Sequence, residues 1–397
     1  MTDSRFDKKS GLAFVVAFGI VSLFADMAYE GMRGISGPFL ATLGASGTAV
    51  GIIAGTGELA GYLLRLFSGA LAQRTRAYWF ITLFGYVIQM AAVPLLALAG
   101  SWWMAALLII LERAGKAMRN PPRDVMLARA GDQIGHGWAF GLHEALDQTG
   151  AIGGPLIAAL VLSLHHDYRM AFAWLGVPAA LTLFSLLILR VRFAFAGHVA
   201  PPDSTTARDG TLPRAFWLYA AASALVGFGF ADFPLIAFHF EKAHVVSQSV
   251  IPLFYAVAMG AAGAGSLVFG RWFDARGLGV LLPGILIGIA VVPLGFFGGF
   301  WLALGGTILW GVSLGVHEAV MSAAVARMVP EQGRARAYGI FTAIFGIAWF
   351  LGSAVQGVLY DFSLPALVTV SVAAEIAAFL PLMAALRQMR RGSVCWA

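Results

Sequence analysis

The stretch LERAGKAMRNPPRD, from Leu111 to Asp124, decides the fold class because it sets a row of charges in an otherwise apolar segment. Four of its charged residues are spaced i, i+4, i+7 and i+11, so that a helix would carry them on one face: Glu112, Lys116, Arg119 and Arg123. Charged side chains within hydrocarbon usually face a bundle interior or a wet cavity. The stretch therefore predicts a membrane helix over 101–122 with a charged inner face.

The end of this expected helix carries two prolines and further charges. Pro121 and Pro122 are expected to end the helix on the water side of the membrane. Arg123 and Asp124 have an alternative explanation, a belt of charges at the membrane interface. That alternative fits Glu112 and Lys116 less well because both lie deeper in the apolar run; Glu112 lies about 16 Å along a helix from Ser101.

The composition around this stretch is that of a membrane protein. The chain has 397 residues, of which 59% are hydrophobic and 12% charged, and its mean hydropathy is +0.81. Soluble domains usually have about 25% charged residues. Apolar runs long enough to cross a bilayer recur along the chain, and we count twelve expected transmembrane helices in an all-α fold. The net charge of +6 does not indicate nucleic-acid binding, because the basic residues are spread over the loops.

The distribution of Lys and Arg predicts the orientation. Basic residues cluster in every second loop, on the same side as the N-terminus, whereas the opposite loops hold little beyond Arg169 and Lys242. Both termini are therefore expected in the cytoplasm. The only long polar connection, 192–213, is expected to be a cytoplasmic linker between an N-terminal six-helix bundle, 1–191, and a C-terminal one, 214–397.

Three local similarities indicate that the two halves are repeats. The segment 138–154 aligns with 336–352, so that Gly154 corresponds to Gly352. GALAQRTR, from Gly69, corresponds to GRWFDARG, from Gly270. Phe24-Ala25-Asp26 corresponds to Phe230-Ala231-Asp232. Matches in the same order support two pseudo-symmetric repeats with a site between them.

These motifs resemble those of the major facilitator superfamily over essentially the whole chain. GALAQRTR, with Gly69 and Arg74, is similar to the superfamily's loop 2–3 signature, but has Gln73 in place of the expected acid; the second copy keeps its acid as Asp274. Gly150, Gly154 and Pro155 resemble the antiporter motif of the fifth helix. The resemblance implies a twelve-helix transporter in a bacterial inner membrane, and the antiporter-like motif favours export.

Several acids are candidates for proton coupling because a carboxylate in hydrocarbon is costly unless it is paired or takes up a proton. Asp26, about 22 Å along the first helix from Gly11, shares a stripe with Glu30 and Arg33. Glu58 lies at a similar depth, and Arg33 and Arg113 are the expected counter-charges. The alternative is a permanently ionised Asp–Arg pair that only holds helices together. Asp147 and Glu112 are the further proton-coupling candidates.

The remaining candidates are expected to line a substrate cavity. They are Glu30, Arg33, Arg113, Lys116, Arg119, His143, Asp232, Trp310, His317 and Glu318. His143 could titrate near neutral pH or be a structural histidine, and Trp310 could stack on a substrate or simply pack. Pro234 is expected to break the helix over 214–240 and to free carbonyls. The first half is richer in charge and the second in aromatic residues, which suits an amphipathic or charged organic substrate.

The function that these features favour is proton-coupled export of a small molecule by a monomer in the lipid bilayer. The alternatives are a proton symporter that imports an organic acid or similar nutrient, and a membrane sensor or scaffold that transports nothing. An enzyme is not expected, because the chain has no Walker A segment. No cofactor is expected, and His165, His166 and Asp167 are too few and too close for a metal site.

Overall fold

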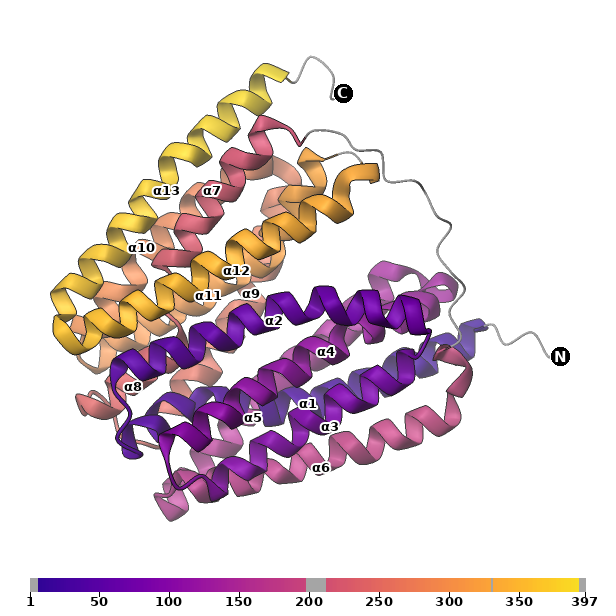
Figure 1. Ribbon diagram of the computed structural model, residues 1–397, viewed down its shortest axis with the longest axis horizontal. Coiled ribbons are helices and arrows are strands. Elements are labelled where there is room, and N and C mark those ends of the chain that lie inside the picture. Colours follow the sequence, from indigo (N-terminus) through magenta and orange to yellow (C-terminus); the bar gives the residue numbers. More distant parts are fainter. Residues whose placement is uncertain (1–5, 198–211, 330, 393–397) are drawn as a thin grey trace. The chain divides into compact units, whose positions relative to one another are not determined.

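The computed structural model describes residues 6–197, 212–329 and 331–392, and within them the regular structure is helical (Figure 1). Thirteen α-helices follow one another: α1 (Lys8–Thr42), α2 (Gly47–Thr75), α3 (Tyr78–Leu95), α4 (Trp102–Ile134), α5 (His136–His165), α6 (Tyr168–Arg192), α7 (Arg214–Gly229), α8 (Phe233–Lys242), α9 (Ile251–Arg276), α10 (Leu281–Phe297), α11 (Phe300–Met328), α12 (Glu331–Phe362) and α13 (Leu364–Gly392). Three short 3₁₀ segments are η1 (Leu96–Leu98), η2 (Ala194–Gly197) and η3 (Gly277–Val280).

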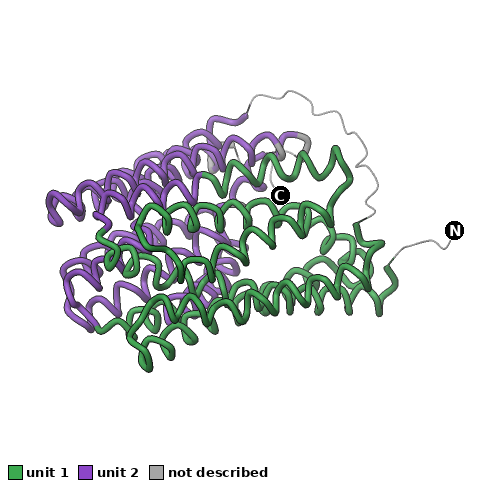
Figure 2. The backbone as a smooth tube through the Cα atoms, turned by 60° about the horizontal axis from the view of Figure 1, so that its bottom comes forward, with its two compact units in different colours: residues 1–44, 60–203, 247–256 green, residues 45–59, 204–246, 257–397 purple. Residues whose placement is uncertain are grey.

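The chain forms two compact units, which Figure 2 colours separately. Unit 1 comprises residues 1–44, 60–203 and 247–256, and unit 2 comprises residues 45–59, 204–246 and 257–397. Two helices contribute to both units, since α2 and α9 each cross a boundary between them. Most of the expected linker, 198–211, lies outside the described residues. The division into six-helix bundles at 1–191 and 214–397 remains a prediction.

The helices are long and apolar enough for a multi-pass membrane protein. Ten candidate spans are found in the described residues, and one of them, Ile251–Phe297, contains both α9 and α10. α4 is not among the ten, because charged side chains interrupt its apolar run. Large apolar side chains such as Phe67, Trp103 and Phe184 are more than half exposed, as suits contact with lipid. The expected total of twelve spans remains a prediction.

The prediction that α4 ends at Pro121 and Pro122 is wrong. The helix runs through both prolines to Ile134. A proline inside a helix removes an N–H and leaves the carbonyl of residue i−4 without its usual donor. For Pro121 that carbonyl belongs to Ala117, and the Ser68 hydroxyl of α2 donates to it across 3.4 Å. A neighbouring helix thus supplies a replacement hydrogen bond, as is usual in membrane bundles.

The predicted break near Pro234 is confirmed, so that 214–240 is not one continuous helix. α7 ends at Gly229, and α8 begins at Phe233 with the proline in its first turn. Side chains of neighbouring helices bond the carbonyls at the break. The Gln356 amide of α12 donates to the carbonyls of Phe228 and Gly229, and the Trp310 indole of α11 donates to that of Ala231.

Glycines allow backbones within each unit to touch. In unit 1 a Cβ added to Gly154 of α5 would lie 2.0 Å from the Met27 carbonyl oxygen of α1. In unit 2 a Cβ added to Gly352 of α12 would lie 2.2 Å from the Phe228 carbonyl oxygen of α7. Such small residues give van der Waals contact between membrane helices. The two glycines that the sequence alignment pairs therefore occupy similar close crossings.

Candidate functional site

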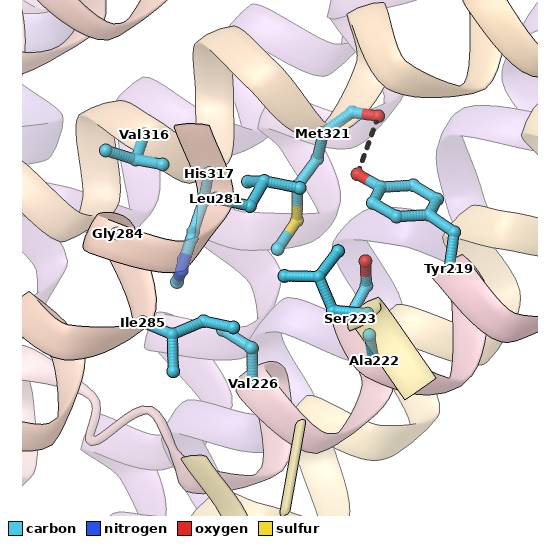
Figure 3. A pocket seen from close by; sticks show the side chains of 11 residues that line it. Tyr219, Ala222, Ser223, Val226, Leu281, Gly284, Ile285, Val316, His317 and Met321 are labelled. Carbon is cyan, nitrogen blue, oxygen red and sulfur yellow. Dashed lines mark hydrogen bonds between the residues drawn. The ribbon is translucent and has the colours of Figure 1, made fainter. Parts of the chain in front are cut away.

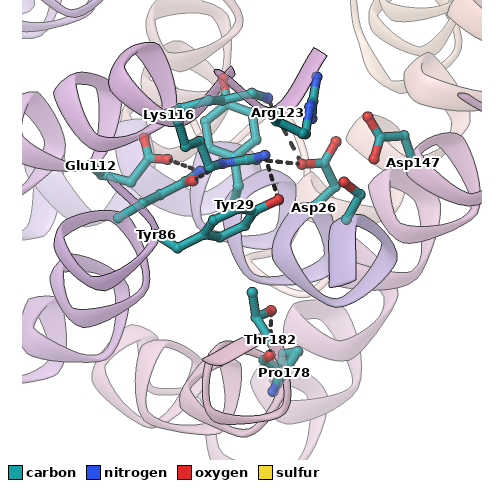
Figure 4. A network of polar contacts seen from close by, with 12 residues as sticks. Asp26, Tyr29, Tyr86, Glu112, Lys116, Arg123, Asp147, Pro178 and Thr182 are labelled. Atoms are coloured by element: carbon teal, nitrogen blue, oxygen red, sulfur yellow. Dashed lines mark hydrogen bonds and ion pairs between the residues drawn. The ribbon is translucent and has the colours of Figure 1, made fainter. Parts of the chain in front are cut away.

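The best-defined polar site lies in unit 1 around Asp26 of α1 (Figure 4). Its Oδ1 atom lies 3.5 Å from the Arg119 guanidinium and 3.9 Å from the Lys116 ammonium, both of α4. Asp26 is 7% exposed and Arg119 is fully buried. Both distances exceed that of a hydrogen bond, and Oδ1 accepts none in the described part of the chain. Asp26 is thus held by loose ion pairs.

Gln89 of α3 joins two charged groups on the same face of α4, Glu112 and Arg119. Its amide donates to Glu112 Oε1 across 2.8 Å, and its carbonyl oxygen accepts from Arg119 Nε at 2.5 Å. Arg119 also donates to the Tyr86 hydroxyl at 2.9 Å and lies over that ring. A chain of contacts therefore runs from Glu112 through Gln89 and Arg119 to Asp26. We call these four residues with Lys116, Tyr86 and Tyr29 the Asp26 cluster.

The backbone geometry explains why Gln89 can reach both partners. α3 and α4 cross at Gly85 and Gly115, where an added Cβ on either residue would lie within 3 Å of the other helix's backbone. Such a close crossing brings short side chains of one helix into direct contact with the other. Gln89 is one turn beyond Gly85 and therefore lies between Glu112 and Arg119.

Tyr29 forms the aromatic wall of the cluster. The Lys116 ammonium lies 3.5 Å from the centre of its ring, and the Arg113 guanidinium lies 5.0 Å away. Arg113 also donates a hydrogen bond to the Tyr29 hydroxyl. Cations over an aromatic face are stabilised by its quadrupole. Lys116 therefore has two attractive neighbours, the Asp26 carboxylate and the Tyr29 ring.

The rest of the predicted stripe on α1 is also buried in unit 1. Glu30 accepts a 2.5 Å hydrogen bond from the hydroxyl of Tyr255, at the start of α9. One turn further on, Gly34 leaves room for that tyrosine, because a Cβ there would lie 3.0 Å from its ring. Arg33 is 7% exposed. The stripe of Asp26, Glu30 and Arg33 is thus buried.

The polar pair of α5 lies beside α1. The Nε2 atom of His143 lies 3.4 Å from the Ser22 hydroxyl and 3.9 Å from Asp147. His143 is buried and Asp147 is half-buried. The Nδ1 atom of His143 and the Oδ1 atom of Asp147 have no hydrogen-bond partner within the described residues. Arg123, the last residue of the predicted face of α4, bonds to its neighbour Asp124 at 2.8 Å.

Several candidates in unit 2 lie beside aromatic side chains. Asp232, in the break between α7 and α8, accepts hydrogen bonds from the Trp349 indole at 3.0 Å and the Ser353 hydroxyl at 2.5 Å. Trp310 is fully buried, as expected of a packing aromatic. His317 is half-buried with its ring 5.0 Å from that of Phe230.

The two remaining candidate acids differ in burial. Glu318 is exposed on α11, and Glu58, in the part of α2 that belongs to unit 2, is half-buried.

An apolar pocket in unit 2 is lined by α7, α10, α11 and α13 (Figure 3). Tyr219, Ser223, His317 and Met321 are among its lining residues. Figure 3 shows the His317 ring between the side chains of the pocket, and its Nδ1 atom has no hydrogen-bond partner in the part of the chain that the structure describes. The pocket thus holds the polar edge of the His317 ring in apolar surroundings.

The residues of the loop motifs lie at matching crossings in the two units. An added Cβ on Gly69 of α2 would lie 3.5 Å from Pro121 of α4. An added Cβ on Gly270 of α9 would lie 3.9 Å from Ala319 of α11. The motif residues Arg74 and Asp274 are both exposed near the ends of their helices.

Sequence reasoning placed the charged face of α4 correctly but missed several of its partners. The ion pairs of Asp26 join it to Lys116 and Arg119, whereas Arg33 and Arg113 were the expected counter-charges. Gln89 could have been found as the single polar amide in an apolar run, because polar residues in membrane helices are costly and usually partnered. The same signal marks Glu375, the only charged residue between 364 and 386. No group of three or more potential metal ligands occurs in the described residues.

Comparisons with known proteins agree with this architecture. The sequence pattern of the Major Facilitator Superfamily matches residues 12–297. An uncharacterized protein of Mycobacterium tuberculosis is 39% identical over 387 residues, which are 94% of this chain and 93% of the relative. Multidrug resistance protein MdtH of Proteus mirabilis is 30% identical over 42% of this chain and 37% of its own length.

Among solved structures, the nucleoside transporter NupG has the same fold. Its TM-score is 0.73 at 16% sequence identity, and the match covers 95% of this chain and 99% of NupG. Together with the family match over residues 12–297, this establishes a multi-pass membrane transporter. The chain belongs to the major facilitator superfamily.

Proposed function

We propose that the protein is a proton-coupled exporter of a small amphipathic or charged organic molecule, with the Asp26 cluster as its coupling site. The observation that carries the proposal is the loose attachment of Asp26 to Lys116 and Arg119 inside a membrane-spanning unit. A buried carboxylate with partners this loosely held can exchange them for a proton at small structural cost. A permanent structural pair would be expected to form direct hydrogen bonds.

The proposed coupling uses two states of the cluster. When Asp26 is ionised, Lys116 and Arg119 stay beside its carboxylate, at the ion-pair distances of 3.9 Å and 3.5 Å. When Asp26 takes up a proton, the attraction disappears and both cations are released toward Tyr29, Tyr86 and Gln89, which they already contact. A proton gradient could thereby change the relative populations of two conformations. Substrate and proton would then compete for one state, which produces exchange.

Export is favoured by two observations. Gly150 and Gly154, the glycines of the antiporter-like motif, form the close crossing of α5 and α1 next to Asp26. A protein named multidrug resistance protein MdtH is similar over 42% of this chain, and export of foreign compounds is one route to such resistance. An aromatic face with adjacent cations suits an amphipathic substrate that carries a polar group.

Import of an organic acid by proton symport is the alternative function that the cluster also allows. Arg113 and Lys116 both lie over Tyr29, and such a pair of cations could bind a carboxylate. Symport and antiport differ in the direction in which substrate moves when protons flow inward. A sensor or scaffold would move neither. We propose further that the protein acts as a monomer in a bacterial inner membrane.

Transport in sealed proteoliposomes with an imposed pH gradient tests the proposal. The probes are ethidium, a lipophilic cation, and carboxyfluorescein, an organic anion. For the wild-type protein we expect at least one probe to move uphill against the proton flow. Asp26→Asn should lose this uphill movement by at least tenfold while keeping probe-for-probe exchange. Glu58→Gln tests the other candidate acid of similar depth.

The matched control is Asp132→Asn, which alters a carboxylate whose side chain is 61% exposed near the end of α4. It should transport like the wild type. Uphill movement of a probe in the same direction as the protons would establish the importer. Wild-type accumulation by both Asp26→Asn and Glu58→Gln would exclude these acids from coupling, and Asp147 and Glu112 would be tested next.

A further inference from the structure

Unit 2 contains a buried acid, Glu375, that lies outside the Asp26 cluster and has no role in the function proposed for that cluster. Glu375 lies in the middle of α13 and is 1% exposed. Its carboxyl group makes no hydrogen bond or ion pair with any described residue, and its Oε2 atom is buried without a partner. Another buried acid of unit 2, Asp232 just before α8, accepts hydrogen bonds from Trp349 and Ser353. Glu375 is therefore isolated in a way that Asp232 is not.

The backbone of two neighbouring helices surrounds this carboxyl group. A Cβ added to Gly288 of α10 would lie 2.9 Å from Glu375 Oε1 and 3.1 Å from its carboxyl carbon. A Cβ added to Gly229, the last residue of α7, would lie 3.0 Å from Glu375 Cγ. Both glycines thus leave the space that the glutamate side chain fills. A larger residue at either position would compete with it.

Within the described residues, the elements packed against α13 bring no cation to the carboxyl group. α10 has no titratable side chain. On α7, Arg214 lies fifteen residues from Gly229, about 22 Å along the helix, and Tyr219 donates its hydroxyl to the Met321 carbonyl. On α13 itself, Arg387 lies three turns away.

α12 also packs against α13, and α8 follows the break at the end of α7. The residues that carry charge or titrate on the described side chains of these two elements are Arg334, Arg336, Tyr338, Tyr360 and Asp361 of α12, and Asp232, His239, Glu241 and Lys242 around α8. Asp361 accepts from the backbone of Gly47 and Thr48, and His239 bonds to Tyr360. None of them forms an ion pair or hydrogen bond with Glu375 in the part of the chain described.

The broken helix adds a second argument against a negative charge at this place. α7 ends at Gly229, so its last carbonyls point toward the break, and the C-terminus of a helix carries a partial negative charge. The Gly229 carbonyl accepts from the Ser371 hydroxyl and from Gln356, which leaves no donor there for a carboxylate. An unpaired carboxylate in apolar surroundings is strongly disfavoured and binds a proton instead.

We infer that Glu375 is a second proton-binding site of this transporter, located in unit 2, and that the group is protonated in the state described here. Its ligand is a proton, which adds to the carboxylate to give the neutral acid. This inference rests on the proposed function in one respect, namely that protons drive transport. It places a titrating group next to the break between α7 and α8, where the chain departs from helical geometry.

Infrared spectroscopy of the full-length protein in lipid tests the inference without any transport assay. A protonated carboxyl group has a C=O stretching band that a carboxylate lacks. We expect this band at neutral pH in the wild type, its loss in Glu375→Gln, and its retention in Asp132→Asn. The band should shift in heavy water, because a coupling site must exchange its proton with solvent.

Two results would overturn the inference. Identical spectra of wild type and Glu375→Gln would mean that the acid is ionised, and a band that does not shift in heavy water would mean a sealed structural acid. Loss of the band on adding sodium, with choline as the control cation, would identify a sodium site instead. Failure of uphill transport with an exchangeable band present would count against the proposed function but not against this site.

Two glycine variants of α10 give an independent check. Gly288→Ala places a methyl group against the flexible carboxyl end of Glu375, so the band should move to a new frequency. Gly295→Ala is the matched control, because its added Cβ meets only Ile236 at 3.8 Å, and its band should stay unchanged. Equal spectra for the two variants would contradict the position assigned to the carboxyl group.

Thermal unfolding against pH provides a third measurement. In the unfolded chain this glutamate ionises above about pH 4.3, its ordinary pKa. If the folded protein keeps the proton, the unfolded state is increasingly favoured as pH rises. Glu375→Gln has no such group, so its advantage in Tm over the wild type should widen with increasing pH. A constant difference would contradict the inference.

Discussion

At the scale of single residues, Gln89 has the most demanding role in the Asp26 cluster. It is fully buried and bonds an acid with its amide nitrogen and a base with its amide oxygen. A side chain without those atoms would leave Glu112 and Arg119 as charges that lack one partner each. Removing one partner from a buried charged group is far more costly than removing a neutral hydrogen bond.

We therefore expect Gln89→Leu to lower the free energy of unfolding by about 3 kcal/mol or more. The matched control is Thr82→Val on the same helix, because the Thr82 hydroxyl is buried but bonds only to the Tyr78 carbonyl of its own helix. That change should cost about 1 kcal/mol at most. Thermal unfolding of the purified variants measures both. Similar losses in the two variants would show that Gln89 does not hold the charged groups together.

For this part of the cluster, helical periodicity in the sequence predicted only which residues of α4 share a face. The shared face of Glu112, Lys116 and Arg119 follows from spacing within one helix, and the structure confirms that Gln89 and Asp26 link these three residues. The contact with Gln89 depends on how α3 crosses α4, which spacing within α4 does not encode. The same limitation explains the expectation that Arg33 and Arg113 would pair with Asp26.

At the scale of the elements, the crossing of α1 and α5 depends on glycine. An added Cβ on Gly154 would lie 2.0 Å from the Met27 carbonyl oxygen and 2.7 Å from the Gly31 nitrogen. Both are backbone atoms, so neither can rotate out of the way. Any larger side chain must separate the two helices, and α1 carries Asp26.

Gly154→Leu should therefore abolish transport of a probe that the wild type moves, although the protein still reaches the membrane. Gly141→Leu, on the same helix, is the matched control because no atom lies within 4 Å of its added Cβ. Flux in proteoliposomes and the amount of protein in the membrane fraction are measured together. Wild-type flux in Gly154→Leu would show that the antiporter-like motif has no role here.

The element boundaries show what local sequence can and cannot predict. Pro234 marked a real break, since α7 ends at Gly229 and the proline lies in the first turn of α8. Pro121 marked no helix end, because α4 continues through it. A neighbouring helix donates to the carbonyl four residues before the proline in both cases, so the position of a proline in the sequence does not by itself decide whether a helix breaks. Glycine spacing was more informative, since Gly154 and Gly352 both lie at close crossings.

At the scale of the whole molecule, the fold class was predictable because hydropathy is a property of the entire chain. The family match and the NupG fold agree with the resemblance found in the motifs. The crossing of Gly69 with Pro121 in unit 1 and that of Gly270 with Ala319 in unit 2 are consistent with two repeats. The isolated acid Glu375 shows where the view of an apolar second half was incomplete.

The orientation in the membrane follows from basic residues at the helix ends. The last turns of three helices carry arginine: Arg74 in α2, Arg190 and Arg192 in α6, and Arg276 in α9. If successive spans alternate in direction, these helix ends lie on the same side of the membrane as Lys8, at the start of α1. Positively charged loops are retained in the cytoplasm during insertion. Both termini and the linker should therefore be cytoplasmic.

Reporter fusions test this orientation directly. A fluorescent protein that matures only in the cytoplasm should be bright when fused after Ala200 or Ala397, two positions outside the described residues. Alkaline phosphatase, which is active only in the periplasm, should be inactive at both positions and active after His166, between α5 and α6. Phosphatase activity after Ala200 would reverse the assignment. Asp26 would then lie on the opposite side of the membrane midplane, although protons would still move down their gradient.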